Sequence, residues 1–168
     1  MNLSNVAVQL IGLVAFILLM ISYYKETTNK ILIIQIISTI LYCIHYLLLG
    51  AYSGLFICIY EVILDYGYYK TTWDNKIFLI SLPLYILAGI LSYHTFLDLF
   101  SILASLSDRY FLTKERHLVI IGGIITYILW LIYDIHVKSI AGIITDSILV
   151  ISNTKILLTE YKQNIIRK

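Results

Sequence analysis

Two carboxylates stand in a stretch of sequence that is otherwise apolar. Glu61 and Asp65 lie in residues 54–69, GLFICIYEVILDYGYY. Their i, i+4 spacing places both on one face of a helix, about 6 Å apart. An acidic group at bilayer depth costs about 2.5–3.5 kcal/mol, so such residues usually face a protein interior or a wet cavity. The pair predicts a pathway for a polar solute and, as two like charges in low dielectric, a shared proton.

The composition places this chemistry inside a membrane. Of the 168 residues, 60% are hydrophobic and 13% are charged, and the mean hydropathy is +0.89. These values lie outside the range of soluble domains. At about 20 residues per crossing, the chain has room for six or seven helices and no separate soluble domain. Cys43 and Cys58 both fall in apolar runs, so neither a disulfide framework nor a metal site is indicated.

The apolar runs predict an all-α membrane protein with seven transmembrane helices. Polar loops and turns separate the runs, which span residues 3–24, 31–49, 54–69, 77–93, 95–112, 118–135 and 139–158. With the N-terminus outside, the inner loops and tail hold nine Lys and Arg residues, whereas the outer segments hold Lys138 alone. Because positive charge is retained on the cytoplasmic side, the expected topology is N-out/C-in.

An internal repeat is indicated by sliding the chain against itself by 88 residues. This offset superposes the first three helices on the last three and brings Gly54 onto Gly142. One linker helix between two triplets gives both the same orientation, so the pattern predicts a 3+1+3 parallel-repeat bundle. The expected units are residues 1–70, a linker helix at 71–94, residues 95–158 and a basic cytoplasmic tail at 159–168. The alternative is an ordinary seven-helix bundle whose internal similarity is due to chance.

Candidate binding residues gather near mid-membrane when depth is counted from the helix ends at 1.5 Å per residue. The offset pairs Tyr42 with Trp130 and Cys58 with Asp146. Aromatic faces can stack on a ring, and carboxylates can accept hydrogen bonds or hold a cation. The predicted substrate-binding residues are Tyr42, Glu61, Trp130 and Asp146, with Asp65 and its offset partner Asn153 one turn further in. Plain packing of the aromatic residues and interhelical hydrogen bonding of the carboxylates are the alternatives.

Two further layers of polar residues flank this level. Toward the cytoplasm, Asp108 and Arg109 form a candidate inner gate, in which Arg109 pairs with Asp108 or Asp65. Solvated or snorkelling side chains are the alternative for this layer. On the outer side, we expect a shallower polar layer of four residues: His45, Asp98, Tyr133 and Asp134.

Several short motifs resemble those of the bacterial YgjV-type inner-membrane proteins. They are YCIHYLLLGAY at 42–52, WLIYD at 130–134 and SIAG at 139–142, together with Asp146 and Asn153. The resemblance covers residues 11–156 and implies a multi-pass protein of the bacterial cytoplasmic membrane. That family is distantly similar to the SWEET, PQ-loop and PnuC carriers, which implies a transporter-like fold with a solute site between the repeats. The sequence departs from the family pattern at Cys58, Glu61 and Asp65, where an asparagine and a basic residue are expected.

Three functions are compatible with these features. The first is a small polar-solute carrier that works by alternating access. The second is the substrate-binding subunit of an ATPase-driven vitamin importer, and the third is a non-transporting receptor or assembly factor. The chain has no GxSxG, HExxH, Walker or CxxC motif. We therefore expect no enzyme activity, metal or cofactor. The expected partners are a small-molecule solute and the lipid bilayer, without nucleic acid and with a homo-oligomer left open.

Overall fold

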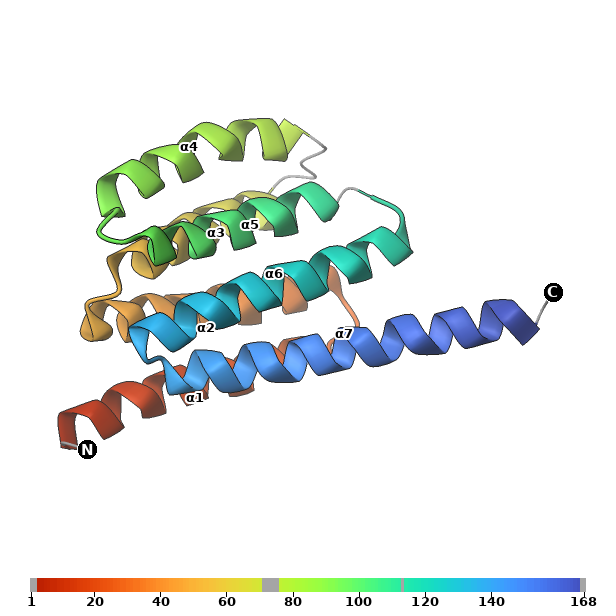
Figure 1. Ribbon diagram of the computed structural model, residues 1–168, viewed down its shortest axis with the longest axis horizontal. Coiled ribbons are helices and arrows are strands. Elements are labelled where there is room, and N and C mark those ends of the chain that lie inside the picture. Colours follow the sequence, from red (N-terminus) through yellow and green to blue (C-terminus); the bar gives the residue numbers. More distant parts are fainter. Residues whose placement is uncertain (1–2, 71–75, 113, 167–168) are drawn as a thin grey trace.

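The computed structural model describes residues 3–70, 76–112 and 114–166, which form seven α-helices and one short 3-10 helix (Figure 1). In chain order they are α1 (Leu3–Ser22), α2 (Thr28–Leu49), α3 (Tyr52–Lys70), α4 (Lys76–Ser92), η1 (Phe96–Asp98), α5 (Leu99–Phe111), α6 (Arg116–Val137) and α7 (Ile140–Ile166). The prediction of an all-α membrane protein with seven helices is confirmed. Parts of the predicted loops at 70–76 and 113–117, and Arg167 and Lys168 of the predicted tail, lie outside the described residues.

The outer surface of the bundle is suited to lipid. Within the described residues, α1, α2, α6 and α7 are each long and apolar enough to cross a membrane. Large apolar side chains are exposed on the outer surface of the bundle, for example Leu10 at 55% and Ile90 at 71%. The α5 helix has only 13 residues and so extends about 20 Å. Because α5 is shorter than the hydrocarbon core is thick, its polar side chains are not in contact with lipid over a full membrane crossing.

Two equivalent turns join α2 to α3 and α6 to α7. Gly50 ends α2 in the left-handed conformation with φ 71°, and Lys138 ends α6 with φ 59°. The next amide in each turn, that of Ala51 or Ser139, donates at 2.9 Å to a carbonyl of the last helical turn. This is a common way to satisfy the free carbonyls at a helix C-terminus. The two turns are separated by the same 88 residues as the predicted repeat.

Two predicted helix ends were wrong. The expected tail at 159–168 is not separate, because α7 continues to Ile166 without a Gly or Pro to end it, and Glu160 on α7 pairs with Arg116 on α6 at 2.7 Å. The fifth helix does not begin at Thr95, because the Asp98 carboxylate accepts hydrogen bonds from the backbone amides of His94 and Thr95 at 3.0 and 2.7 Å. Asp98 therefore organises a 3-10 turn ahead of α5.

The helices pack in a sequence that repeats between the two halves. In the first half α1 contacts α2 and α2 contacts α3, and in the second half α5 contacts α6 and α6 contacts α7. The halves meet where α1 packs on α7 and where α5 packs on α3, while α4 lies against α3 and α5. These contacts are those that a two-fold relation between the triplets would give. The repeat and its boundaries stay a prediction.

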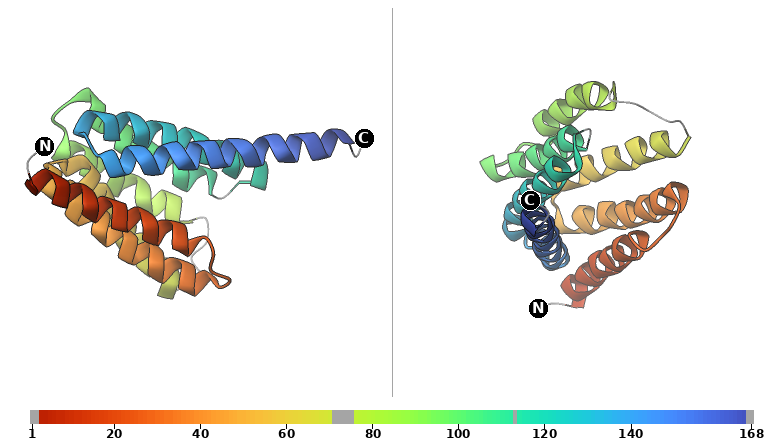
Figure 2. Two further views of the ribbon diagram at one scale, coloured as in Figure 1. Left: turned by 90° about the horizontal axis from the view of Figure 1, so that it is seen from below. Right: turned by 90° about the vertical axis from the view of Figure 1, so that its right-hand side faces the viewer.

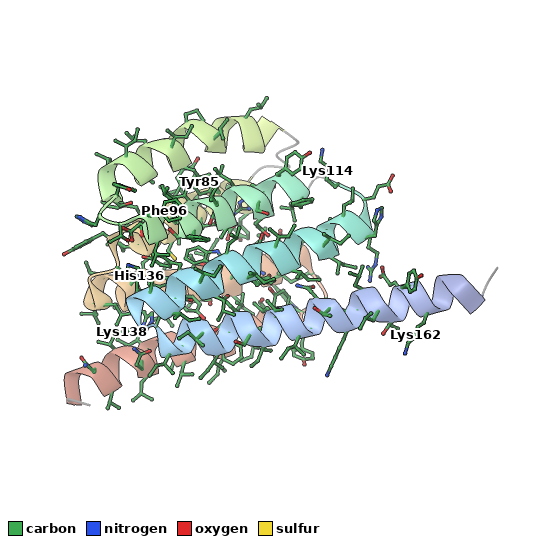
Figure 3. All side chains as sticks on the ribbon, viewed as in Figure 1. Tyr85, Phe96, Lys114, His136, Lys138 and Lys162 are labelled. Carbon is green, nitrogen blue, oxygen red and sulfur yellow. The ribbon has the colours of Figure 1, made fainter. Side chains whose placement is uncertain are left out.

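The bundle is tighter at one end than at the other. The Gly50 end, which carries the Gly50 and Lys138 turns, lies opposite the Lys114 end, where α5 leads into α6 (Figure 3). In Figure 2, α1 and α7 lie close together at the Gly50 end and diverge toward the Lys114 end. Gln9 on α1 donates from Nε2 to the Lys138 carbonyl at 3.1 Å and accepts from the Ala141 amide at 3.3 Å. These bonds hold α1 against the start of α7.

Candidate functional site

A cavity of about 590 Å³ lies between the two halves of the bundle. Side chains from α1, α2, α3, α5, α6 and α7 line its wall. All eight residues predicted to bind the solute or to form the gate are among them: Tyr42, Glu61, Asp65, Asp108, Arg109, Trp130, Asp146 and Asn153. Their common location is a structural fact, whereas the binding and gating roles stay predictions.

Arg109 lies between the two carboxylates of α3. Its guanidinium forms an ion pair with Glu61, and a second one with Asp65 at 3.3 Å. Tyr85 on α4 also donates to Glu61, at 2.9 Å. Arg109 is only 7% exposed, so most of its surface is taken from solvent. The α3 carboxylates, the guanidinium and the tyrosine form one buried network, which we call the Arg109 network.

This network adds a positive charge to the predicted like-charge pair. Glu61 and Asp65 share a helix face, as the sequence predicts, but a guanidinium from α5 contacts both of them. A positive charge beside two carboxylates weakens their mutual repulsion, and the proton shared by the pair stays a prediction. The expected pairing of Arg109 with Asp65 is present, together with a contact to Glu61 that the sequence does not predict. Asp108 and Asn153 line the same cavity, from the last turn of α5 and from α7.

Three aromatic rings form a row along the wall. Tyr42 and Tyr46 are stacked with ring centroids 6.1 Å apart, and Tyr46 and Trp130 are stacked at the same separation. The predicted pair of Tyr42 and Trp130 is therefore connected through Tyr46, which the sequence analysis did not select. Two signals could have found this residue. Tyr46 is one turn from Tyr42, and the 88-residue offset pairs it with Asp134, to which its hydroxyl donates at 2.9 Å.

Asp134 and Asp146 form a second acidic site at the other side of the row. They are 1% and 6% exposed, and their carboxyl groups contact each other. Gly142 lies against the Asp134 carboxylate, where a Cβ atom would overlap it. The Oδ2 atom of Asp146 has no hydrogen-bond partner among the described residues. The sequence predicts Asp134 in a shallower polar layer, but it is part of the cavity wall, since its carboxylate lies against Gly142 of α7.

Hydrogen bonds close the bundle at the Gly50 end. His45 on α2 bonds through Nδ1 to the Val8 carbonyl and through Nε2 to Ser139 Oγ, both at 2.9 Å. The Tyr133 hydroxyl on α6 accepts from the Gly54 amide at 2.8 Å and from Ser53 Oγ at 2.9 Å. His45 and Tyr133 are related by the 88-residue offset, and each joins one half to the other. Ser53 Oγ also donates to Asp98 at 3.2 Å, so His45, Asp98 and Tyr133 of the expected outer polar layer lie at this end, whereas Asp134 lines the cavity.

Comparison with known proteins settles the family. Residues 6–164 match the family model Imp-YgjV, which is described as a bacterial inner membrane protein. The chain belongs to the YgjV family. No curated protein and no solved structure matches this YgjV-family chain. Its location in the bacterial inner membrane follows from the family, together with the apolar helices that fit a multi-pass protein.

The likeness to SWEET, PQ-loop and PnuC carriers has no counterpart among these matches and stays a prediction. The structure shows what surrounds the third-helix residues at which this YgjV protein is expected to depart from the family pattern. Cys58 lines the cavity near Cys43, and the positive charge beside Glu61 comes from Arg109 on α5 instead of from α3. The cavity is thus built with carboxylates on α3 and a guanidinium facing them.

Proposed function

We propose that this YgjV-family protein is a carrier that moves a small polar solute across the inner membrane by alternating access. The observation that supports it most is the cavity of about 590 Å³ between the two halves. Cavities of this size are suited to small molecules, and the wall combines aromatic faces with a few polar groups, as ligand sites usually do. A site formed by both halves can be exposed to either side when the halves rock against each other.

The unequal ends of the bundle support the same mechanism. At the Gly50 end, His45 and Tyr133 join the halves through short hydrogen bonds. Toward the Lys114 end, α1 and α7 diverge (Figure 2). A carrier needs two conformations in which opposite ends are closed in turn. In this proposal the present arrangement is the one closed at the Gly50 end, and the solute leaves or enters toward the Lys114 end.

The proposed role is not enzymatic and needs no cofactor. Glu61 and Asp65 are engaged in the Arg109 network, and Asp134 and Asp146 contact each other. We assign them to binding and to gating. Arg109 and Asp108 are the proposed gate, and the row of Tyr42 and Trp130 with the carboxylates Glu61 and Asp146 is the proposed binding surface, extended by Asp65 and Asn153.

Reconstituted transport tests this proposal. The purified protein is first screened for solutes that raise its unfolding temperature, because a ligand that binds only the folded state stabilises it. Solutes that do so are then assayed in proteoliposomes by counterflow of radiolabelled compound. We expect saturable exchange that Trp130→Leu abolishes and that Tyr93→Leu, on a half-exposed aromatic outside the cavity wall, leaves intact.

The same assay separates the other two functions. Binding without counterflow would replace the carrier with a receptor or assembly factor. Flux that appears only with a copurifying ATPase would replace it with the substrate-binding subunit of an importer. Either outcome overturns the proposal.

A further inference from the structure

The cavity wall carries far more negative than positive charge. Five carboxylates and one guanidinium line it: Glu61, Asp65, Asp108, Asp134 and Asp146 against Arg109. The Arg109 guanidinium is already engaged by two of the carboxylates. Within the described part of the chain, neither Asp134 nor Asp146 has a Lys or Arg partner. Two carboxylates in contact at low dielectric repel each other unless one of them keeps a proton or a positive charge lies beside them, and a cation beside the pair favours the charged form of both.

One oxygen of this acidic pair has no hydrogen-bond donor within the described residues. Asp146 is 6% exposed, lines the cavity, and has no hydrogen-bond partner for Oδ2 within the described residues. Asp134 differs, because Tyr46 donates to its Oδ1 at 2.9 Å. A buried acceptor that lacks a donor costs free energy, more so when it is charged. A solute with a positively charged donor group would satisfy both the hydrogen bond and the charge.

The aromatic row is connected to the same carboxylates. The Tyr42 hydroxyl donates to Thr145 Oγ1 at 2.8 Å, and Thr145 immediately precedes Asp146 on α7. The Tyr46 hydroxyl is bonded to Asp134 itself. The faces of Tyr and Trp attract cations, and they also stack on flat rings. Aromatic surface and unpaired carboxylate thus lie side by side in one cavity.

From these observations we infer that the solute is a small organic cation, with its charged group at Asp146 and its flat or methylated body on the row formed by Tyr42, Tyr46 and Trp130. This inference deepens the proposed carrier and relies on the cavity being its solute site. In the Arg109 network both carboxylates already contact a guanidinium, whereas Asp134 and Asp146 contact none within the described residues. The charge of the solute is therefore directed to the Asp134 and Asp146 side.

Pairs of nearly isosteric probes test the charge directly. Binding to the purified full-length protein in detergent is measured by isothermal titration calorimetry with benzamidinium against neutral benzamide, and with choline against neutral 3,3-dimethylbutan-1-ol. We expect at least one cation to bind about tenfold or more tightly than its neutral partner, a difference of about 1.4 kcal/mol. Asp146→Asn should remove that preference, and Asp146→Glu, which keeps the charge, should retain it.

A matched control is available in Asp98→Asn. Asp98 is 7% exposed, as buried as Asp146, but it is absent from the cavity wall. Asparagine can still accept the hydrogen bonds that cap the η1 turn. This variant should keep the cation preference. Size-exclusion profiles and circular dichroism check that each variant is folded.

Equal affinity for charged and neutral partners would overturn the inference, as would a preference that survives Asp146→Asn or that Asp146→Glu also loses. The outcome is separable from the fate of the carrier proposal. Cation binding without counterflow contradicts the carrier alone. Counterflow of a neutral solute, together with no preference for cations, contradicts the inferred charge of the solute and leaves the carrier proposal standing.

Discussion

Arg109 is the residue on which the electrostatics of the cavity depend most. It holds Glu61 and Asp65 from a position that is 7% exposed. Removing one partner from a buried ion pair leaves an uncompensated charge and typically costs about 3–5 kcal/mol. We expect Arg109→Gln to lower the free energy of unfolding by about that amount, measured by circular dichroism during SDS titration in mixed micelles.

Arg116→Gln is the control for this substitution. Arg116 pairs with Glu160 at 2.7 Å, but its side chain is 79% exposed. Exposed ion pairs contribute about 0–1 kcal/mol, so this variant should unfold almost like the wild type. Equal losses in the two variants would contradict the buried network around Arg109.

Tyr46 and Tyr42 differ in what their hydroxyl groups satisfy. Tyr46→Phe removes the donor to the buried Asp134 carboxylate, and an orphaned buried acceptor costs about 1–3 kcal/mol. Tyr42→Phe removes a bond to Thr145, whose hydroxyl still donates to the Ala141 carbonyl at 2.8 Å, so a loss of about 0.5–1.5 kcal/mol is expected. The same SDS titration compares them, and a larger loss for Tyr42→Phe would refute this ranking.

The environment of a single residue was predictable where its type and its depth in the membrane were enough to indicate it. Acidic groups at Glu61, Asp65 and Asp146 are expensive in an apolar run, and that cost directed attention to a wet interior, where they do line the cavity. Pairing was less predictable, since the partner of Glu61 comes from α5, 48 residues away. Spacing along one helix describes only that helix. Tyr46 was missed because an aromatic residue in an apolar segment is indistinguishable from packing until its neighbours are known.

At the scale of helices, Gly142 determines how closely α6 and α7 approach. A Cβ atom at this position would overlap the Asp134 carboxylate. Gly142→Ala should therefore destabilise the protein by about 1–3 kcal/mol, because overpacking forces the side chain or the helix to shift. The unfolding temperature in detergent measures the effect. Its structural cause is the displacement of the Asp134 carboxylate, which is now only 1% exposed, from its buried position against Gly142.

Gly89→Ala is the matched substitution on α4. The nearest atom to its Cβ would be Ile102 Cδ1 at 2.6 Å, the tip of a flexible side chain that can rotate away. Alanine also favours a helix over glycine by about 1 kcal/mol, which offsets the crowding. If Gly89→Ala proved as harmful as Gly142→Ala, the close contact with Asp134 would not be the reason.

Helix positions followed well from the sequence, and helix ends did not. The positions of α2 and α6 follow from long apolar runs, because such a run must be surrounded by lipid or by protein. The last turns of α7 carry Glu160, which pairs with Arg116 on the neighbouring α6, and the start of α5 is set by the Asp98 carboxylate, which accepts hydrogen bonds from His94 and Thr95. Both are tertiary or capping contacts that hydropathy does not register. The equal turns at Gly50 and Lys138 are the best local sign of the predicted repeat.

For the molecule as a whole, the predicted N-out/C-in topology is open to a simple measurement. Green fluorescent protein fused after Lys168 should fluoresce, because it folds in the cytoplasm, and alkaline phosphatase at the same position should be inactive. Alkaline phosphatase inserted after Lys138 should be active, because that turn is expected outside. The reverse pattern would contradict the orientation drawn from the nine inner cations.

The central claim is that the cavity opens to both sides of the membrane in turn. A single cysteine at Asn153, with Cys43 and Cys58 replaced by Ser and Ala, can be probed in right-side-out and inverted vesicles with a charged, membrane-impermeant methanethiosulfonate. Ile151→Cys is the control, since Ile151 is 55% exposed on the outer surface of α7 and absent from the cavity wall. We expect the cysteine at 153 to react from both sides and the one at 151 from neither. Reaction of the cysteine at 153 from one side only, in the presence and absence of the solutes that stabilise the protein, would contradict it.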